Sequence, residues 1–256
     1  PKIYLFYMLQ RMIKISTAFA FLLLAVQLKS IGQKQSVPIR GTWITNTASD
    51  AMKSKKNIRK AIQLCKKSGI NNVYVVVWNN GETMFPSKVV EEYIGIKQSA
   101  VYGTMDPIKE IIKAGIKVHA WFEFGFSYSY GDSNCIWQKR YPHWIGRDAA
   151  GNALQKNKFY WWNALHPEVQ AFMNKLVLEV VNNYKVDGVQ GDDRLPAMPV
   201  EGGYDALSKK MYAGEHNGAT PPADCNDTAW VQWRANKLSA YIKQLYQLVK
   251  AAKPTC

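Results

Sequence analysis

The sequence predicts an α/β fold of four parallel βα units that curve as the first half of a (β/α)8 barrel. Two observations predict it. A short apolar strand, a loop and a helix recur in the same order four times along the 256 residues, which is typical of parallel βα units. In addition, one face of the later strands is polar. This favours a barrel with a site at its rim over the fully buried strands of a doubly wound sheet.

The strands are predicted where short runs rich in β-branched and aromatic residues end in polar residues. They cover residues 40–46, 71–79, 117–124 and 186–193. The helices follow from apolar residues at helical spacing, such as Ile58 and Ile62, and from start signals, such as Asp106 before Pro107. The last two helices are expected to begin at the segment HPEV and near residue 227.

The number of units indicates an incomplete barrel. A closed barrel of the TIM type needs eight units, about 250 residues in compact examples, and roughly 400 or more with loops of this length. Residues 40–253 supply four units. We therefore expect residues 33–256 to form the N-terminal part of a barrel, a truncated half-barrel.

Residues 1–32 have the layout of a secretory signal peptide preceded by some upstream residues. Lys14 precedes an apolar core at about residues 16–26, and small residues lie at Ser30 and Gly32. This core is shorter than the about 20 apolar residues of a membrane span, which favours cleavage after Gly32 over a stable membrane anchor. We expect an exported protein, periplasmic or extracellular.

Charge and cysteine usage argue against several classes of protein. The net charge is +14, but six Lys and Arg and no acidic residue lie within residues 1–40, which leaves 27 basic against 19 acidic residues. Without a long basic run or zinc-finger spacing, this mild excess predicts no nucleic-acid partner. The four cysteines are isolated, so neither a metal nor a cofactor is predicted. Cys65 is expected in the core, and a Cys135–Cys225 disulfide is left open.

Alternation along the third and fourth strands sorts their side chains, because successive residues point to opposite faces. The helix-facing set in the third strand is Val118, Ala120, Phe122 and Phe124, and the opposite set is His119, Trp121 and Glu123. In the fourth strand Gly188, Gln190 and Asp192 share that opposite face. Glu123 and Asp192 are therefore expected at the carboxyl-terminal rim, facing inward.

The fourth strand ends in Asp192, Asp193 and Arg194. A cation beside paired carboxylates keeps at least one of them ionised despite their repulsion. Asp193 should point away from Asp192 and fix Arg194 or a loop amide. The alternatives are an ion-pair cluster that only caps the strand and a divalent-cation site, which the opposite directions of the two carboxylates disfavour.

Further candidates for binding a polar ligand lie near the same rim. Glu123 is either an acceptor for a hydroxyl group, a substitute acid, or a partner of Arg194 or His119. Asn79 and Asn163 either bind hydroxyls or cap loops and helices. The loop at 125–165 holds ten aromatic residues in 41, which form either a wall for stacking on sugar rings or a small core of the loop itself. The remaining candidate contacts are Trp78, His119, Trp121, Tyr128 and Trp161.

Several motifs resemble a known family. RGTWITN, VVVWNNGETMFPS, HAWFEFGF, NALHPEV and VDGVQGDDRLPAMPVEGGYD are similar to glycosyl-hydrolase-like family ten, bacterial envelope proteins related to the α-amylase-type barrel glycosidases. The resemblance runs from about residue 40 to residue 254. It implies a (β/α)8 fold and a polysaccharide substrate, with peptidoglycan glycan as the expected one.

The resemblance also implies a role for Asp192. In the amylase-type pattern the carboxylate that ends the fourth strand is the nucleophile, and the proton donor follows a fifth strand, beyond Cys256. A retaining glycosidase needs both groups. The sequence therefore predicts a glycoside hydrolase with Asp192 and Glu123 as catalytic candidates. The alternative is a carbohydrate-binding envelope protein that does not cleave.

Overall fold

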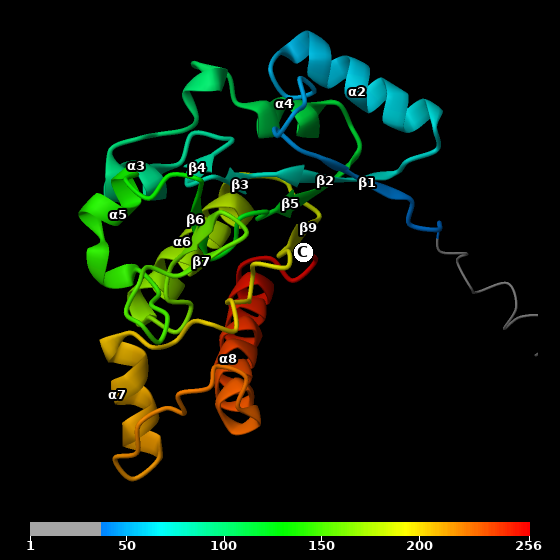
Figure 1. Ribbon diagram of the computed structural model, residues 1–256. Coiled ribbons are helices and arrows are strands. Elements are labelled where there is room, and N and C mark those ends of the chain that lie inside the picture. Colours follow the sequence, from blue (N-terminus) through cyan, green and yellow to red (C-terminus); the bar gives the residue numbers. More distant parts are fainter. Residues whose placement is uncertain (1–36) are drawn as a thin grey trace, which may run out of the picture. The chain divides into compact units, whose positions relative to one another are not determined.

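The computed structural model describes residues 37–256, and residues 40–256 form one compact unit. The predicted signal peptide lies outside the described residues. The central sheet contains four parallel strands in the order β1 (Gly41–Ile44), β2 (Asn72–Val76), β5 (Lys117–Trp121) and β9 (Gly188–Gln190) (Figure 1). Strand order follows chain order, which confirms the α/β class and the parallel sheet. The described strands form an open sheet, and closure into a barrel stays a prediction.

The register of the strands brings their carboxyl ends together. Val76 of β2 pairs with Trp121 of β5, and Trp121 pairs with Gln190 of β9. The hydrogen-bonded ladder ends there, two or three residues earlier than the predicted strands. Glu123 and Asp192 follow directly, so both lie at one rim of the sheet.

Burial follows the predicted alternation. The residues expected to face the helices are buried: Val118, Ala120, Phe122 and Phe124. On the opposite face three rings stack across neighbouring strands. Trp43 lies 5.2 Å from Tyr74, and Tyr74 lies 4.7 Å from His119, measured between ring centroids. Trp43 is 55% exposed, so this face of the sheet is open at β1.

Four helices complete the βα units: α2 (Lys55–Lys67), α4 (Pro107–Lys113), α6 (Pro167–Asn183) and α8 (Thr228–Ala252). Their N-termini are capped as the sequence indicates, because the side chains of Asp106 and Asp227 each accept a hydrogen bond from a backbone N–H in the first turn. In Figure 1 α2 lies beside α4, and α6 lies beside α8. Cys65 on α2 is partly buried against the core, as expected.

Further short elements follow the main strands, and apart from β3, which lies within the predicted strand 71–79, the sequence pattern did not reveal them. These are β3 (Trp78–Asn79), β4 (Glu82–Thr83), α3 (Lys88–Ile94), η1 (Ala100–Tyr102), β6 (Ser127–Tyr130), α5 (Ile136–Arg140), η2 (Pro142–Trp144), β7 (Gln155–Lys156), β8 (Phe159–Trp161) and α7 (Ala206–Glu215). Strands β3 and β4 form a hairpin around Asn80 and Gly81, whose φ angles of 50° and 75° are those of a type I′ turn. This hairpin holds Asn79 at the rim.

The aromatic residues of the 125–165 loop mainly form a core. Trp137, Trp144 and Trp162 are at most 1% exposed. Trp162 lies between 5.1 and 6.1 Å from the rings of its aromatic neighbours, which are Trp78, Tyr128, Trp137, Trp144 and Phe172. We call these six residues the aromatic cluster. For most of the loop, the alternative of a glycan-stacking wall is therefore wrong and that of a small core is right. A segment this long buries its own apolar rings.

A buried arginine organises the segment between β9 and α8. Arg234 is 3% exposed and donates to the carbonyl oxygens of Val200, Gly202 and Cys225 at 2.5–2.7 Å. These bonds satisfy a buried guanidinium that would otherwise be costly, so they fix the path of the segment that follows the rim.

No helix within residues 37–256 is long and apolar enough to cross a membrane. The four cysteines, all of which lie in this range, are free thiols. The Cys135–Cys225 disulfide that the sequence left open is therefore not formed.

Replacing Trp162 tests the role of the aromatic cluster. Trp162→Ala should lower the free energy of unfolding by about 3–5 kcal/mol, because it leaves a cavity among packed rings. The matched control is Tyr246→Ala, which removes a ring that is 61% exposed and should cost about 1 kcal/mol or less. Urea denaturation followed by circular dichroism measures both, and equal losses in the two variants would contradict the assignment of a core.

Candidate functional site at the sheet rim

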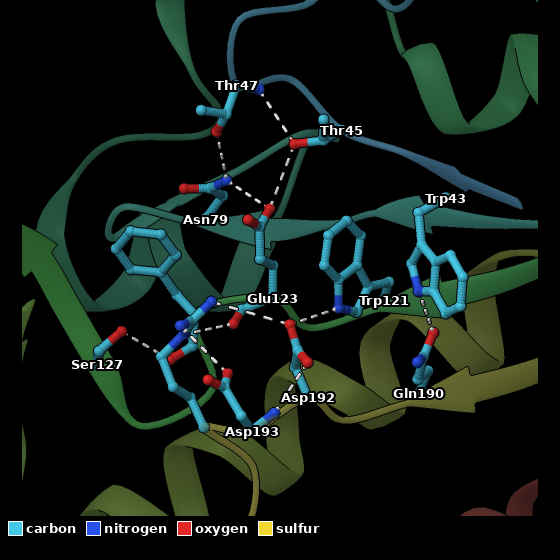
Figure 2. Close-up of polar contacts among 12 residues, drawn as sticks. Trp43, Thr45, Thr47, Asn79, Trp121, Glu123, Ser127, Gln190, Asp192 and Asp193 are labelled. Atoms are coloured by element: carbon cyan, nitrogen blue, oxygen red, sulfur yellow. Dashed lines mark hydrogen bonds and ion pairs between the residues drawn. The ribbon is translucent and has the colours of Figure 1, made fainter. Parts of the chain in front are cut away.

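The rim brings together polar side chains from the ends of the parallel strands. Thr45 follows β1, Asn79 belongs to the hairpin after β2, Glu123 follows β5 and Asp192 follows β9. Figure 2 shows Asn79 and Thr45 reaching Glu123 from one side, while Asp192 lies beside Trp121. Four segments far apart in sequence thus converge because the sheet is parallel and its strands end at the same level.

Asp192 is held by hydrogen bonds and keeps part of its surface in solvent. Its Oδ2 accepts from Trp121 Nε1 at 3.2 Å, and its Oδ1 accepts from the backbone N–H of Asp193 at 2.9 Å. The side chain is 32% exposed. Trp121 lies on the face opposite the helix-covered one, so Asp192 is on that face too. A carboxylate in this setting is oriented yet accessible to a ligand.

Arg194 connects the end of β9 to the end of β5. Its Nε donates to the carbonyl oxygen of Glu123 at 2.9 Å, and its Nη1 pairs with Asp193 Oδ1 at 3.1 Å. Nη2 lies 3.8 Å from Asp192 Oδ2, at the limit of an ion pair. The guanidinium is also stacked 4.6 Å from the centroid of the Phe159 ring. With 13% of its side chain exposed, Arg194 places positive charge next to both aspartates.

Gly125 permits this close approach of the two segments. Its φ angle is +48°, which disfavours other residues, and a Cβ there would overlap the carbonyl oxygen of Arg194. The same carbonyl accepts a hydrogen bond from Phe126 N–H at 2.9 Å. The glycine thus lets the chain after β5 pack directly on the Arg194 segment.

Glu123 occupies a different environment from Asp192. Its Oε2 accepts from Asn79 Nδ2 at 2.7 Å and from Thr45 Oγ1 at 3.4 Å. Burial raises the pKa of Glu123, and the charge of Asp192 adds to the rise, whereas Arg194 and the bond from Asn79 oppose it. The carboxylate has no direct bond to His119 or Arg194, so two of its predicted partners are replaced by Asn79 and Thr45.

A pocket of about 600 Å³ opens beside Glu123. Its lining combines polar and aromatic residues, which are Asn46, Thr47, Asn79, Asn80, Glu123, Phe124, Tyr130, Asn157 and Phe159. Amide and hydroxyl groups next to exposed ring faces suit a neutral, hydroxyl-rich ligand. Asp192 does not line this pocket, although Arg194 links it to Phe159, which does.

Sequence reasoning missed four groups at the rim and pocket. Thr45, Asn46 and Thr47 directly follow β1. The alternation that identified Glu123 at the end of β5 would have identified Thr45 and Thr47, but not Asn46. Asn157 lies in the turn between β7 and β8, and no pattern in the sequence connects it with the rim. The pocket also retains Tyr130 and Phe159 from the predicted aromatic wall.

Four predicted contacts lie away from the pocket. Trp78 and Tyr128 belong to the aromatic cluster, and Trp161 is 7% exposed, so none of them offers a ring face to a ligand there. Asn163 is 1% exposed and donates to Asp205 Oδ1 at 2.9 Å, where it ties its loop to the start of α7. The prediction that these four residues contact a ligand is therefore wrong. Their side chains pack within the protein and stabilise the fold.

His119 and Trp121 lie on the face of the sheet opposite the helices, where Trp121 is 9% exposed. His119 Nε2 bonds with Asn72 Oδ1 at 2.8 Å and lies lower in the strand than Glu123, which fits the interior role considered from the sequence. Burial lowers the pKa of His119. Trp121 contacts Asp192 rather than the pocket, so its role here is to orient that carboxylate.

Among residues 37–256, the group of three potential metal ligands whose atoms lie close together includes neither Asp192 nor Asp193. Both are instead linked to Arg194, and Asp193 is 73% exposed. The 3.1 Å ion pair between Arg194 Nη1 and Asp193 Oδ1 agrees with the prediction that Asp193 fixes Arg194.

The fold and the sequence together define a family. Residues 38–256 match the model of the family described as glycosyl hydrolase-like 10, and the chain belongs to this family. The chain is 26% identical over 236 residues to glycosyl hydrolase YngK of Bacillus subtilis, covering 84% of this chain and 43% of that protein. It is also 26% identical over 261 residues to glycosyl hydrolase DigH of Escherichia coli, covering 87% and 54%. The chain thus spans about half the length of these curated relatives.

Solved structures with a similar fold include glycoside hydrolases with TIM-barrel-like folds. α-L-Fucosidase isoenzyme 2 from Paenibacillus thiaminolyticus superposes with a TM-score of 0.58 at 18% identity, covering 85% of this chain and 31% of that one. At this identity the likeness concerns the fold. It agrees with the arrangement of the parallel strands and their helices.

The pKa of Glu123 predicts how stability depends on pH. A carboxyl group whose pKa is raised in the folded state stabilises the fold below its unfolded pKa, about 4.3, and this contribution is lost as pH rises through the folded pKa. Glu123→Gln should remove that loss. Urea midpoints of the wild type and Glu123→Gln between about pH 4 and 7 measure it, with exposed Glu92→Gln as the control.

In this experiment the wild type should lose stability relative to Glu123→Gln as pH rises, while Glu92→Gln should follow the wild type. A wild-type curve parallel to that of Glu123→Gln would contradict the raised pKa.

Proposed function

We propose that the chain is the N-terminal part of a glycoside hydrolase that acts on a bacterial envelope polysaccharide, with peptidoglycan glycan strands as the preferred substrate. The proposal rests on the position of the Asp192 side chain. It is an oriented, partly exposed carboxylate at the carboxyl-terminal rim of a parallel sheet, and family membership supports a carbohydrate substrate. The chain spans about half the length of its relatives. Catalysis by the whole protein is therefore also part of the proposal.

In this proposal Asp192 is the nucleophile or stabilises an oxocarbenium-like transition state. Trp121 donates a hydrogen bond to Asp192, and Arg194 lies 3.8 Å from the same carboxylate oxygen, so both contacts orient the group towards the rim. Glu123 is the second carboxylate. Its raised pKa suits a group that carries a proton, and Asn79 holds it at the pocket wall. A proton donor from a later strand is the alternative to Glu123.

The pocket next to Glu123 is the proposed site for a sugar unit. Asn46, Asn79 and Thr47 offer hydrogen-bond donors and acceptors, and Phe159 and Tyr130 offer rings. Hydroxyl groups of a sugar pair with the former, and its C–H faces pack on the latter. Arg194 stacks on Phe159, so it links this pocket to Asp192.

One observation favours a second function. The pocket is lined by Glu123 and not by Asp192, which would suit a protein that holds glycan without cleaving it. Incubation of the full protein with denuded glycan strands separates the two functions. Retention of glycan without new reducing ends would support binding alone.

Substitution of Asp192 tests the proposed reaction. In the full-length protein, Asp192→Asn should lower the hydrolysis rate of glycan strands by about 10⁴-fold or more, as expected for loss of a nucleophile. Asp193→Asn is the matched control and should cost less than about tenfold, because an exposed ion pair contributes little. Circular dichroism checks that both variants fold. Unchanged turnover in Asp192→Asn would remove this residue from the mechanism.

We also propose that the protein is exported, on the basis of the pattern in residues 1–32. Expression in a bacterial host followed by N-terminal sequencing of the extracytoplasmic protein checks this. The mature chain should begin at Gln33. An uncleaved chain confined to the cytoplasm would contradict export.

A further inference from the structure

A group of metal-ligating side chains lies outside the rim. His143 belongs to η2, whereas His166 and Glu168 lie at the start of α6. One potential ligand atom from each residue lies within 4.8 Å of the other two, and among the described residues this is the group of three or more His, Cys, Asp and Glu with such spacing. We propose that these three side chains bind a transition-metal ion of the Zn²⁺ type.

The donor set indicates the class of ion. Imidazole nitrogen and carboxylate oxygen are common ligands of Zn²⁺, which often takes three protein ligands and a water molecule. Imidazole also suits Ni²⁺ and Cu²⁺, whereas Ca²⁺ and Mg²⁺ prefer oxygen ligands alone. Two histidines and one glutamate therefore favour Zn²⁺, Ni²⁺ and Cu²⁺ over Ca²⁺ and Mg²⁺.

Existing contacts already hold the three side chains together. His143 Nε2 lies 3.0 Å from Glu168 Oε2, and Trp144 Nε1 donates to the same oxygen at 2.8 Å. A metal ion would replace the contact between His143 and Glu168. The bond from Trp144 can persist and orient the carboxylate, as outer-shell partners do in metal sites.

Binding of a metal ion would also break one existing hydrogen bond. The ring of His166 accepts a bond from Glu168 N–H at 3.2 Å, which caps α6. A metal-bound imidazole has no second acceptor nitrogen, so this cap is lost. The positive end of α6 opposes a cation as well, but the carboxylate of Glu168 offsets this effect.

Two of the three side chains are exposed to solvent, so an ion can reach the site. The side chains of His143 and Glu168 are 53% and 60% exposed. Ligand atoms around a tetrahedral zinc ion are about 3.4 Å apart, given Zn–N bonds of about 2.0–2.1 Å. Closing from 4.8 Å to that spacing requires rotation of the exposed His143 and Glu168 side chains and of the half-buried His166 ring.

The fold explains why the sequence predicted no metal. His143 is separated from His166 by the β7–β8 hairpin, so no short spacing connects them. Trp144, next to His143, stacks 4.3 Å from Tyr141 and belongs to the aromatic cluster. A bound ion would therefore fasten the outer edge of this cluster to α6 and stabilise the loop.

Titration of the metal-free protein with ZnCl₂ in a calorimeter tests the site. We expect one ion per chain and a rise in melting temperature, since a ligand that binds only the folded state stabilises it. CaCl₂ and MgCl₂ should produce neither effect. The variants are His143→Gln and His166→Asn, and asparagine retains the ability to cap the helix.

Each variant should bind Zn²⁺ at least about tenfold more weakly, because loss of even an outer-shell partner typically costs about 10–100-fold in affinity. His216→Gln, a histidine substitution on α7's C-cap, is the matched control and should leave binding unchanged. Circular dichroism verifies that all variants fold. Failure of the wild type to bind Zn²⁺, or equal affinity in His143→Gln, His166→Asn and the wild type, would overturn the proposal. Neither outcome bears on hydrolysis at the rim.

Discussion

The contacts of Arg194 are the constraint on which the rest of the rim depends. One guanidinium pairs with Asp193, bonds the backbone of Glu123 and stacks on Phe159. It thereby joins the end of β9, the end of β5 and the pocket wall. Three segments that are far apart in sequence therefore depend on one side chain for their relative position. Gly125 is required for the same contact, since a side chain there would meet the Arg194 backbone.

This arrangement gives two neighbouring carboxyl groups different properties. Asp192 faces solvent with a cation and an indole N–H nearby, whereas Glu123 is more buried and has a raised pKa. The proposal of a glycosidase uses this difference, with Asp192 as the candidate nucleophile and Glu123 as the group that carries a proton. Family membership supports a carbohydrate substrate, and the polar and aromatic lining of the pocket suits a sugar unit.

The strand-based part of the site was predictable, because alternation in a strand has a strict period of two. That rule placed Glu123 and Asp192 at one rim, and the same rule applied to β1 would have added Thr45. The aromatic loop was harder to predict, because Trp78 and Tyr128 look the same in sequence whether they bind a sugar or fill a core. Contacts such as Asn157 with the pocket, or His143 with Glu168, depend on how long loops fold back, which local patterns do not encode.

Covalent trapping tests the central claim most directly. A fluorinated glycan analogue that forms a glycosyl–enzyme intermediate but hydrolyses slowly would be incubated with the full-length protein, and the labelled peptide identified by mass spectrometry. The account predicts that the added sugar mass lies on the peptide that contains Asp192. A label on the peptide that contains Glu123 would contradict it.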